Sequence, residues 1–306
     1  MATAISHTKN RRPLTLPWNA APIATHGQTR RDGSILPGLL QRRKVDRVDF
    51  IVAGVQKAGS TALHDFLAQH PHVALLRDQA LHFFDKEEHF RGEPDYRILH
   101  NNFAPGWRWQ IAGEVTADYL YYPRALERIA NYNPQMKLIV SLRNPTERAF
   151  SQWNMRRDKG QEPLEFLDAL RRDEEIGIWK RPRGNGYIGR SLYAPQLEKV
   201  FGLFPREHVL VLKYEEFRRD PSAMLDQMFD FLGVRRLQRF KNKRRNVGSY
   251  SRKLTDEERE YGAAIFQEDI DKTEELLGWD CRDWRVIRSG HRQDLGVAGI
   301  GLVRPG

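Results

Sequence analysis

Cysteine and long apolar runs are scarce in this sequence. Its 306 residues include one cysteine, Cys281, which excludes an intrachain disulfide and any zinc site built from cysteines alone. The longest apolar stretches, such as residues 138–140 and 209–212, are far too short to cross a bilayer. No apolar segment near the N-terminus is followed by a small-residue cleavage site, so no secretory signal is visible. We therefore expect a soluble, cytoplasmic protein without a membrane span.

The residues that are present suffice for a globular fold. Apolar residues make up 40% of the chain and charged residues 29%, a balance that excludes a wholly disordered or fibrous protein. Seven Trp, ten Tyr and fifteen Phe residues can fill a substantial core. The length leaves room for one large α/β domain or two small ones.

The net charge of +10 is unevenly distributed. Residues 1–47 hold nine Lys and Arg against two Asp, and residues 234–253 hold nine more with no acidic residue. The rest of the chain is therefore net acidic, which does not fit a uniformly basic nucleic-acid coat, and we expect no nucleic-acid partner. Each basic segment is either a solvated tail or loop, or an attractor for a polyanionic ligand or acceptor.

Proline content and hydrophobic periodicity divide the chain into an arm, a domain and a tail. Residues 1–46 are punctuated by proline and show neither helical nor strand periodicity, so we expect a basic, mobile N-terminal arm. Residues 47–290 form the predicted domain, and residues 291–306 the predicted C-terminal tail.

Short apolar strands alternate with amphipathic helices within the predicted domain. The predicted strands cover residues 48–54, 136–142 and 208–214, and the helices predicted after them cover residues 60–71, 145–158 and 221–233. This alternation predicts a three-layer α/β domain of P-loop type with a central, mainly parallel sheet. In such folds, ligands bind at the carboxyl ends of the strands.

The segment GVQKAGST, residues 54–61, lies where a predicted strand meets a predicted helix. Backbone N–H groups at a helix start, the Lys57 ammonium and two hydroxyls form a cradle for an anion. A Walker A loop has its lysine directly after the second glycine, whereas Lys57 precedes Gly59. The loop therefore predicts a phosphate site and disfavours a nucleotide kinase or NTPase; the alternative is an ordinary surface lysine.

This loop resembles the 5′-phosphosulfate loop of sulfotransferases that use 3′-phosphoadenosine-5′-phosphosulfate (PAPS), in the branch of heparan sulfate N- and 3-O-sulfotransferases and their bacterial relatives. The segment LIVSLRNPTERAFSQW, residues 138–153, is similar to the family's 3′-phosphate motif, RxPxxRxxS after a strand. HFFDKEEHF (82–90), GEVTADYLYYP (113–123) and GWDCRDW (278–284) extend the resemblance. It implies a PAPS-dependent sulfotransferase that needs no metal.

The resemblance also implies roles for individual residues. Lys57 would stabilise the charge that grows on the leaving phosphate, and the 5′-phosphate would be held by Ala58, Gly59, Ser60 and Thr61. Arg143 and Ser151 would converge on the 3′-phosphate, since Arg offers a charged fork and Ser a hydroxyl. Tyr193 is expected to line the nucleotide cleft. The segment that closes over the cofactor in relatives carries three candidate cations, Lys243, Arg244 and Arg245.

Two groups that the family uses are missing from this sequence. Relatives read K-E-x-H-F-F in the block before the second predicted strand, with the glutamate as catalytic base, and the equivalent residue here is Ala80. The lysine of the family's EKTP segment is replaced by Val115. Alanine cannot accept a proton. Either another group removes the proton of the acceptor's hydroxyl or amine, or the protein has lost sulfuryl transfer.

Three explanations of the missing base stay open. His82 serves as the base with support from Asp85, since an imidazole has a suitable pKa. Alternatively, Asp78 or Glu114 replaces the lost carboxylate. In the third, the chain is a catalytically silent protein that binds PAPS or its product adenosine 3′,5′-bisphosphate (PAP). We expect sulfuryl transfer from PAPS to a hydroxyl or amine of a saccharide, glycolipid or small-metabolite acceptor.

Overall fold

The computed structural model describes residues 42–77, 80–104, 106–107, 110–177, 186–237, 239–241, 250 and 252–285. Its strands are β1 (Arg42–Arg43), β2 (Phe50–Gly54), β3 (Val73–Leu75), β4 (Gly106–Trp107), β5 (Ile111–Val115), β6 (Lys137–Leu142) and β7 (Val209–Lys213). Its α-helices are α1 (Ser60–Leu67), α2 (Arg97–His100), α3 (Ala125–Tyr132), α4 (Pro145–Asp158), α5 (Phe166–Ile176), α6 (Ala194–Leu203), α7 (Tyr214–Arg219), α8 (Pro221–Leu232) and α9 (Asp256–Leu277). Short 3-10 helices lie at Glu87–Phe90, Gly189–Ser191, Arg206–His208 and Arg282–Trp284.

The central sheet has five strands in the order β3-β5-β2-β6-β7, and every neighbouring pair is parallel. The predicted α/β class with a central parallel sheet is confirmed. Strands β2, β6 and β7 are the three predicted from their apolar runs, and α1, α4 and α8 are the helices predicted after them. Strands β3 and β5 were not predicted, because β3 has only three residues and because Gly113 and Glu114 interrupt the apolar run of β5.

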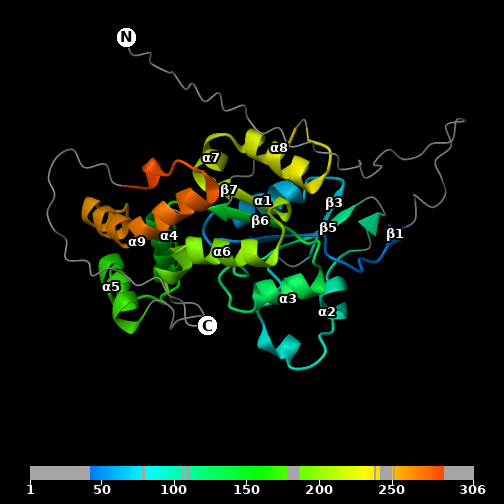
Figure 1. Cartoon of the computed structure of the whole chain (residues 1–306), viewed down its shortest axis with the longest axis horizontal. Coiled ribbons are helices and arrows are strands. Elements are labelled where there is room, and N and C mark those ends of the chain that lie inside the picture. The colour runs from blue at the N-terminus through cyan, green and yellow to red at the C-terminus, as the bar shows by residue number, and fades with distance from the viewer. Residues whose placement is uncertain are drawn as a thin grey trace, which may run out of the picture. The chain divides into compact units, whose positions relative to one another are not determined.

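Helices cover both faces of this sheet (Figure 1). Phe50 and Val52 of β2 pack into a core formed with α1, α7 and α8, whereas Ile51 and Ala53 pack into a second core formed with α3, α4, α6 and α9. Successive side chains of a strand point to opposite faces, so one uninterrupted apolar strand contributes to both layers. This explains why β2 is buried along its whole length.

The order of the strands places a topological switch point between β2 and β6, and we call the region at the carboxyl ends of these two strands the crevice. From β2 the chain passes through α1 to β3 at one edge of the sheet, whereas from β6 it passes in the opposite direction to β7. The carboxyl ends of β2 and β6 therefore flank the point where the winding direction reverses. In open parallel sheets, such a point is where ligands bind.

Local signals set the ends of the two helices that border this crevice. Helix α4 begins at Pro145 because the side chain of Asn144 accepts a hydrogen bond of 3.1 Å from the backbone N–H of Glu147, and proline suits the first helical position. Both ends of the predicted helix 145–158 are therefore correct. Helix α1 ends at Leu67, four residues before the predicted end, because the chain continues as turns.

The described end of the predicted arm takes part in a second, small sheet. Strand β1 pairs with β4 in antiparallel register, and Val45 packs against the core. Residues 1–41 of the predicted arm and the whole predicted tail, 291–306, lie outside the described residues. Within the described ranges, no helix combines the length and the apolar character that a membrane span requires.

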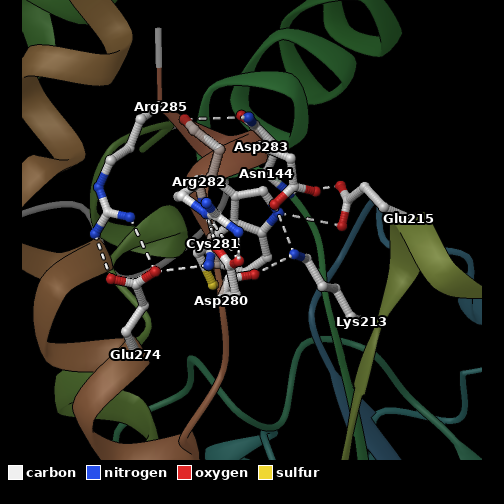
Figure 2. Close-up of polar contacts among 10 residues, drawn as sticks. Asn144, Lys213, Glu215, Glu274, Asp280, Cys281, Arg282, Asp283 and Arg285 are labelled. Atoms are coloured by element: carbon white, nitrogen blue, oxygen red, sulfur yellow. Dashed lines mark hydrogen bonds and ion pairs between the residues drawn. The ribbon is translucent and has the colours of Figure 1, made fainter. Parts of the chain in front are cut away.

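The segment 278–285 follows α9 and packs back against it (Figure 2). Arg285 donates two hydrogen bonds, of 2.9 and 2.5 Å, to the carboxylate of Glu274 near the end of α9. The backbone N–H of Cys281 donates to the same carboxylate at 2.6 Å. Cys281 is fully buried, and burial raises the pKa of its thiol to about 12. This ending is thus packed into the domain.

We expect Gly113→Ala to destabilise the fold. A Cβ atom on Gly113 of β5 would lie 2.0 Å from the ring of Phe50 on β2, which no real contact allows. The free energy of unfolding should fall by about 1–3 kcal/mol, measured by equilibrium denaturation. The matched control is Gly202→Ala in α6, where a Cβ atom meets nothing within 4 Å and the change should be neutral or stabilising. Equal effects of the two substitutions would contradict this account of strand packing.

Candidate functional site

The loop between β2 and α1 adopts a backbone that requires glycine. Lys57 and Gly59 have φ angles of 75° and 87°, and a Cβ atom on Gly59 would lie 2.8 Å from the ring of Tyr214. The hydroxyl of Ser141, on β6, donates a hydrogen bond of 2.8 Å to the carbonyl of Ala58. The loop is therefore held from the neighbouring strand and is free of side-chain bulk at its tightest point.

The start of α1 presents positive charge to the crevice. No side chain caps this end of the helix, so the first N–H groups lack acceptors within the helix and carry its partial positive charge. Burial lowers the pKa of the Lys57 ammonium, and the nearby charges of Arg143 and Arg148 lower it further against the opposing effect of Tyr250. An anion bound at this loop would satisfy both the N–H groups and the ammonium.

Arg143 follows the last residue of β6 and joins the two phosphate motifs. Its Nη1 donates a hydrogen bond of 3.2 Å to the carbonyl of Lys57, and its Nη2 lies 3.1 Å from a carboxylate oxygen of Glu147. The guanidinium also lies over the ring of Tyr214, 5.2 Å from its centroid. Arg143 is 7% exposed. The two phosphate motifs, which are separate in the sequence, are thus in direct contact at the crevice.

Tyr193, the residue before α6, contacts both Arg143 and α9. It is fully buried, and its place in the nucleotide cleft stays a prediction. Its hydroxyl donates a hydrogen bond of 2.7 Å to the carbonyl of Arg143, and its backbone N–H donates to Asp269 of α9 at 2.7 Å. The carboxylate of Asp269 accepts hydrogen bonds from the backbone N–H groups of Tyr193 and Ala194, and so joins the start of α6 to α9. Tyr193 therefore supports Arg143 from beneath.

The C-terminal ending supports the residue after Arg143 (Figure 2). One carboxylate oxygen of Glu215 accepts a hydrogen bond of 2.8 Å from the backbone of Asn144, and the other accepts one of 3.2 Å from the indole of Trp284. The side chain of Asn144 in turn donates to the carbonyl of Trp284 at 3.3 Å. This gives the GWDCRDW segment a physical role, because it fixes the N-cap of α4 beside the crevice.

Ser151 meets a residue that sequence reasoning missed. The hydroxyl of Tyr250 donates a hydrogen bond of 2.9 Å to the hydroxyl of Ser151. Burial alone would raise the pKa of the Tyr250 phenol, but the hydrogen bond with Ser151 and the charges of Arg143 and Lys57 leave this pKa below its ordinary value. Tyr250 thus stands among the three residues that the resemblance assigns to the phosphates. Nothing local in the sequence marks it, since Tyr250 and Ser151 are 99 residues apart.

A histidine and a carboxylate form a pair on the other side of β2. The Nδ1 atom of His82 lies 2.7 Å from a carboxylate oxygen of Asp85, and the side chains are 36% and 5% exposed. The hydrogen bond to Asp85 is the main reason why the pKa of His82 is raised, against the effect of burial, and the charges of Asp118 and Glu114 add to it. Ala80 lies two residues earlier and offers no polar side-chain atom.

Glu114, on β5, is completely buried behind this pair. One of its oxygens accepts hydrogen bonds of 2.6 Å from Tyr119 and 2.8 Å from Thr116, and the other has no hydrogen-bond partner in the described structure. Burial raises the pKa of Glu114 to about 7. The Tyr119 hydroxyl also accepts hydrogen bonds of 2.9 and 3.4 Å from the backbone of Phe83 and Phe84. Glu114 and Tyr119 therefore hold the segment that carries His82.

Comparison with known proteins identifies this arrangement. The family defined by the sulfotransferase domain matches residues 47–247, which include both phosphate motifs. The chain belongs to the sulfotransferase family. This confirms the resemblance drawn from the loop and from the motif after β6.

Two relatives and one solved structure show how far the likeness extends. The chain is 33% identical to mouse heparan sulfate glucosamine 3-O-sulfotransferase 6 over 231 residues, 74% of this chain and 64% of the relative. It is 27% identical to mouse bifunctional heparan sulfate N-deacetylase/N-sulfotransferase 4 over 60% of this chain and 22% of the relative. A crystal structure of a sulfotransferase from Alicyclobacillus acidocaldarius is 30% identical, with a TM-score of 0.66, and covers 78% of this chain and 99% of that one. The chain thus spans less than two thirds of these curated relatives.

The described part of this sulfotransferase gathers most of the predicted site. Lys57, Arg143 and Ser151 meet at the crevice, and His82 is paired with Asp85. The predicted cations Lys243, Arg244 and Arg245 and the alternative base Asp78 lie outside the described residues. Among the residues that the structure does describe, no group of three or more His, Cys, Asp and Glu side chains is arranged to hold a metal ion.

We expect Tyr250→Phe to weaken the binding of PAP about tenfold, because it removes a hydroxyl that touches Ser151 and hydrogen bonds to charged groups are worth about 1.5–3 kcal/mol. The affinity for adenosine 5′-monophosphate, which lacks the 3′-phosphate, should not change. Calorimetric titration of both nucleotides measures this. Tyr261→Phe is the control, since its hydroxyl bonds to Glu174. Equal losses for the two nucleotides would contradict a role of Tyr250 at the 3′-phosphate.

Proposed function

We propose that this protein is an active sulfotransferase that moves the sulfuryl group of PAPS to a hydroxyl or amine of a saccharide acceptor. The observation that carries the proposal is the hydrogen bond of 3.2 Å from Arg143 to the carbonyl of Lys57, which joins the two phosphate motifs at the crevice between β2 and β6. Bound PAPS supplies the sulfuryl group and carries phosphate charge at two positions of one ribose. The chain has to neutralise that charge, orient the acceptor and remove its proton.

The residues of the crevice fit such a donor. The uncapped start of α1 and the Lys57 ammonium suit the 5′-phosphate, and Arg143, Ser151 and Tyr250 form a second polar cluster for the 3′-phosphate. Behind them, Arg148 of α4 is fully buried, and two of its nitrogen atoms have no hydrogen-bond partner in the described structure. Excess positive charge at this edge of the sheet matches a bisphosphate.

We assign the removal of the acceptor's proton to His82. Its imidazole is partly exposed, and Asp85 holds Nδ1, which leaves Nε2 as the nitrogen that takes up a proton. Asp85 also stabilises the imidazolium that then forms. Glu114 is the less suitable base, because it has no exposed surface. Its bond to Tyr119 suits it instead to hold the backbone of Phe83 and Phe84 beside His82.

The proposed acceptor is a saccharide, since the curated relatives named above are sulfotransferases of heparan sulfate and one is named for its glucosamine. Val115 is buried in the core on the α1 side of the sheet, so this position offers no cation to an acidic acceptor. Arg190 lies on the other side of β5, paired with Asp118 and placed over the ring of Tyr121. A glycolipid or a small metabolite with a hydroxyl or amine remains the alternative acceptor class.

The binding of PAP tests the donor site. PAP at 100 times its dissociation constant should stabilise the protein by roughly 2.7 kcal/mol, which a thermal-midpoint measurement detects. Lys57→Ala and Arg143→Ala should each abolish or severely reduce this stabilisation, because each removes the cation of one of the two phosphate motifs. Arg206→Ala is a control, since Arg206 caps the opposite, amino end of β7.

Other ligands separate the rival functions. Stabilisation by ATP that depends on Mg²⁺, with no response to PAP, would indicate a nucleotide kinase or NTPase. Binding of nucleic acid that falls steeply with salt and survives Lys57→Ala would indicate a nucleic-acid protein. If both crevice variants bind PAP as the parent does, the site is assigned to the wrong residues.

The pH dependence of turnover tests the base. His82 has to be neutral to accept a proton, so kcat/KM should rise with pH through the raised pKa of His82 and then level off. Asp85→Asn removes the main cause of that raised pKa, so the rise should move to lower pH. His82→Asn should lower kcat by about 10²–10⁴ while PAP still binds. The assay uses PAPS with a heparan sulfate oligosaccharide as acceptor.

The same assay addresses the silent alternative, which Ala80 motivates. A protein that binds PAP but shows no turnover, and that gains turnover on Ala80→Glu, has lost its chemistry with the family's base. Unchanged or lower turnover in Ala80→Glu supports His82. A pH profile that does not move in Asp85→Asn would refute the assignment of the base to His82.

A further inference from the structure

Arg148 is the charged residue of the RxPxxRxxS motif to which the sequence assigns no role. It lies in the first half of α4, three residues before Ser151, and it has no exposed surface. Residues three apart on a helix share one face, so the side chain of Arg148 starts beside that of Ser151. A guanidinium in this position is both close to the crevice and completely removed from bulk water.

The contacts of Arg148 do not neutralise its charge. Its Nη2 donates to the side-chain oxygen of Gln152 and, at 3.2 Å, to the carbonyl of Tyr187. Its Nε and Nη1 have no hydrogen-bond partner in the described structure. Within the same residues, Arg148 takes part in none of the ion pairs, although Arg143 and Arg190 beside it are each paired with a carboxylate. Every recorded partner of Arg148 is uncharged.

The nearest charges make this burial still less favourable. Burial lowers the pKa of Arg148 to about 10, against the opposing effect of Tyr193, and the charges of Arg190 and Arg143 lower it further. This pKa still leaves Arg148 charged at neutral pH. Arg148 in turn acts on Lys57. A buried charge without a partner is among the most costly features of a folded protein. The cost is explained if a ligand supplies the missing negative charge.

We propose that Arg148 is a buried positioning charge for the donor nucleotide, kept without a carboxylate partner so that the phosphates of PAPS complete it. The proposal rests on the proposed function, because the anion it requires is the bisphosphate of the donor. Arg148 acts on that anion through its field, from behind Lys57, Arg143 and Ser151, which make the direct contacts. An arginine suits this task because its guanidinium keeps its charge when buried.

The test compares ligands of different charge on three proteins: the parent, Arg148→Met and Arg148→Lys. Dissociation constants are measured by calorimetry for PAP and for adenosine, and thermal midpoints are measured without ligand. A charge about 10 Å away at an effective dielectric of about 20 changes affinity roughly tenfold per ligand charge. We therefore expect Arg148→Met to weaken PAP at least tenfold and to leave adenosine within about twofold.

The ligand-free midpoint gives a second readout that a structural role would not produce. Arg148→Met removes an unpaired buried charge, and the carbonyl of Tyr187 keeps its bond of 3.0 Å from Ser191. Its midpoint should therefore equal or exceed that of the parent. Arg128 is the matched control, since it is also buried but is paired with Glu87 at 2.6 Å. Arg128→Met should lower the midpoint and leave the PAP affinity unchanged.

The outcomes separate this proposal from the proposed function. If the parent binds PAP no better than adenosine, the proposed function is refuted by the parent protein alone, whatever the variants do. If the parent prefers PAP, equal losses for PAP and adenosine in Arg148→Met, or no loss for PAP, overturn the role of Arg148. Arg148→Lys keeps the charge and should hold PAP within about threefold, which remains a test if Arg148→Met does not fold. A tenfold loss in Arg148→Lys would show that shape matters instead of charge, and would also overturn it.

Discussion

The hydrogen bond between Arg143 and the carbonyl of Lys57 links the ends of two neighbouring strands, and several contacts from distant parts of the chain hold the residues beside it. Tyr193 holds the carbonyl of Arg143 from beneath. Glu215 and Trp284 hold the next residue, Asn144, from the side. These partners come from the start of α6, from α7 and from the C-terminal ending, so three separate parts of the chain converge on Arg143 and Asn144. A parallel sheet makes this possible, because it brings the carboxyl ends of its strands to one edge.

Charge is divided between the two sides of β2. Toward β6 lie Lys57, Arg143 and Arg148, and toward β5 lie Asp85 and Glu114. A group-transfer enzyme benefits from this separation, since the leaving group becomes negative while the acceptor loses a proton. Although Ala80 replaces the family's glutamate, the side of β2 toward β5 still contains two carboxyl groups. Asp85 remains bonded to the imidazole of His82, and Tyr119 ties the buried Glu114 to the backbone that carries this imidazole.

The parts of the structure that depend on local sequence could be predicted, and the parts that depend on distant contacts could not. The bounds of α4 follow from Asn144 and Pro145, which act within one turn. The phosphate loop follows from its glycines and from Lys57. In contrast, the burial of Tyr193 could not be predicted, because it depends on Asp269, 76 residues away. Tyr250 and the missing counter-ion of Arg148 were not found, since only the folded chain shows which charges have no neighbour.

The single cysteine acquires a use from where it sits. Cys281 lies in the segment whose Trp284 holds Asn144 beside Arg143, and its thiol is buried and un-ionised at neutral pH. An alkylating reagent reaches such a sulfur only when the segment detaches. The rate of alkylation of native protein would therefore report how often the C-terminal ending releases the donor crevice. Cys281 thus offers a native chemical probe for the detachment of the C-terminal ending.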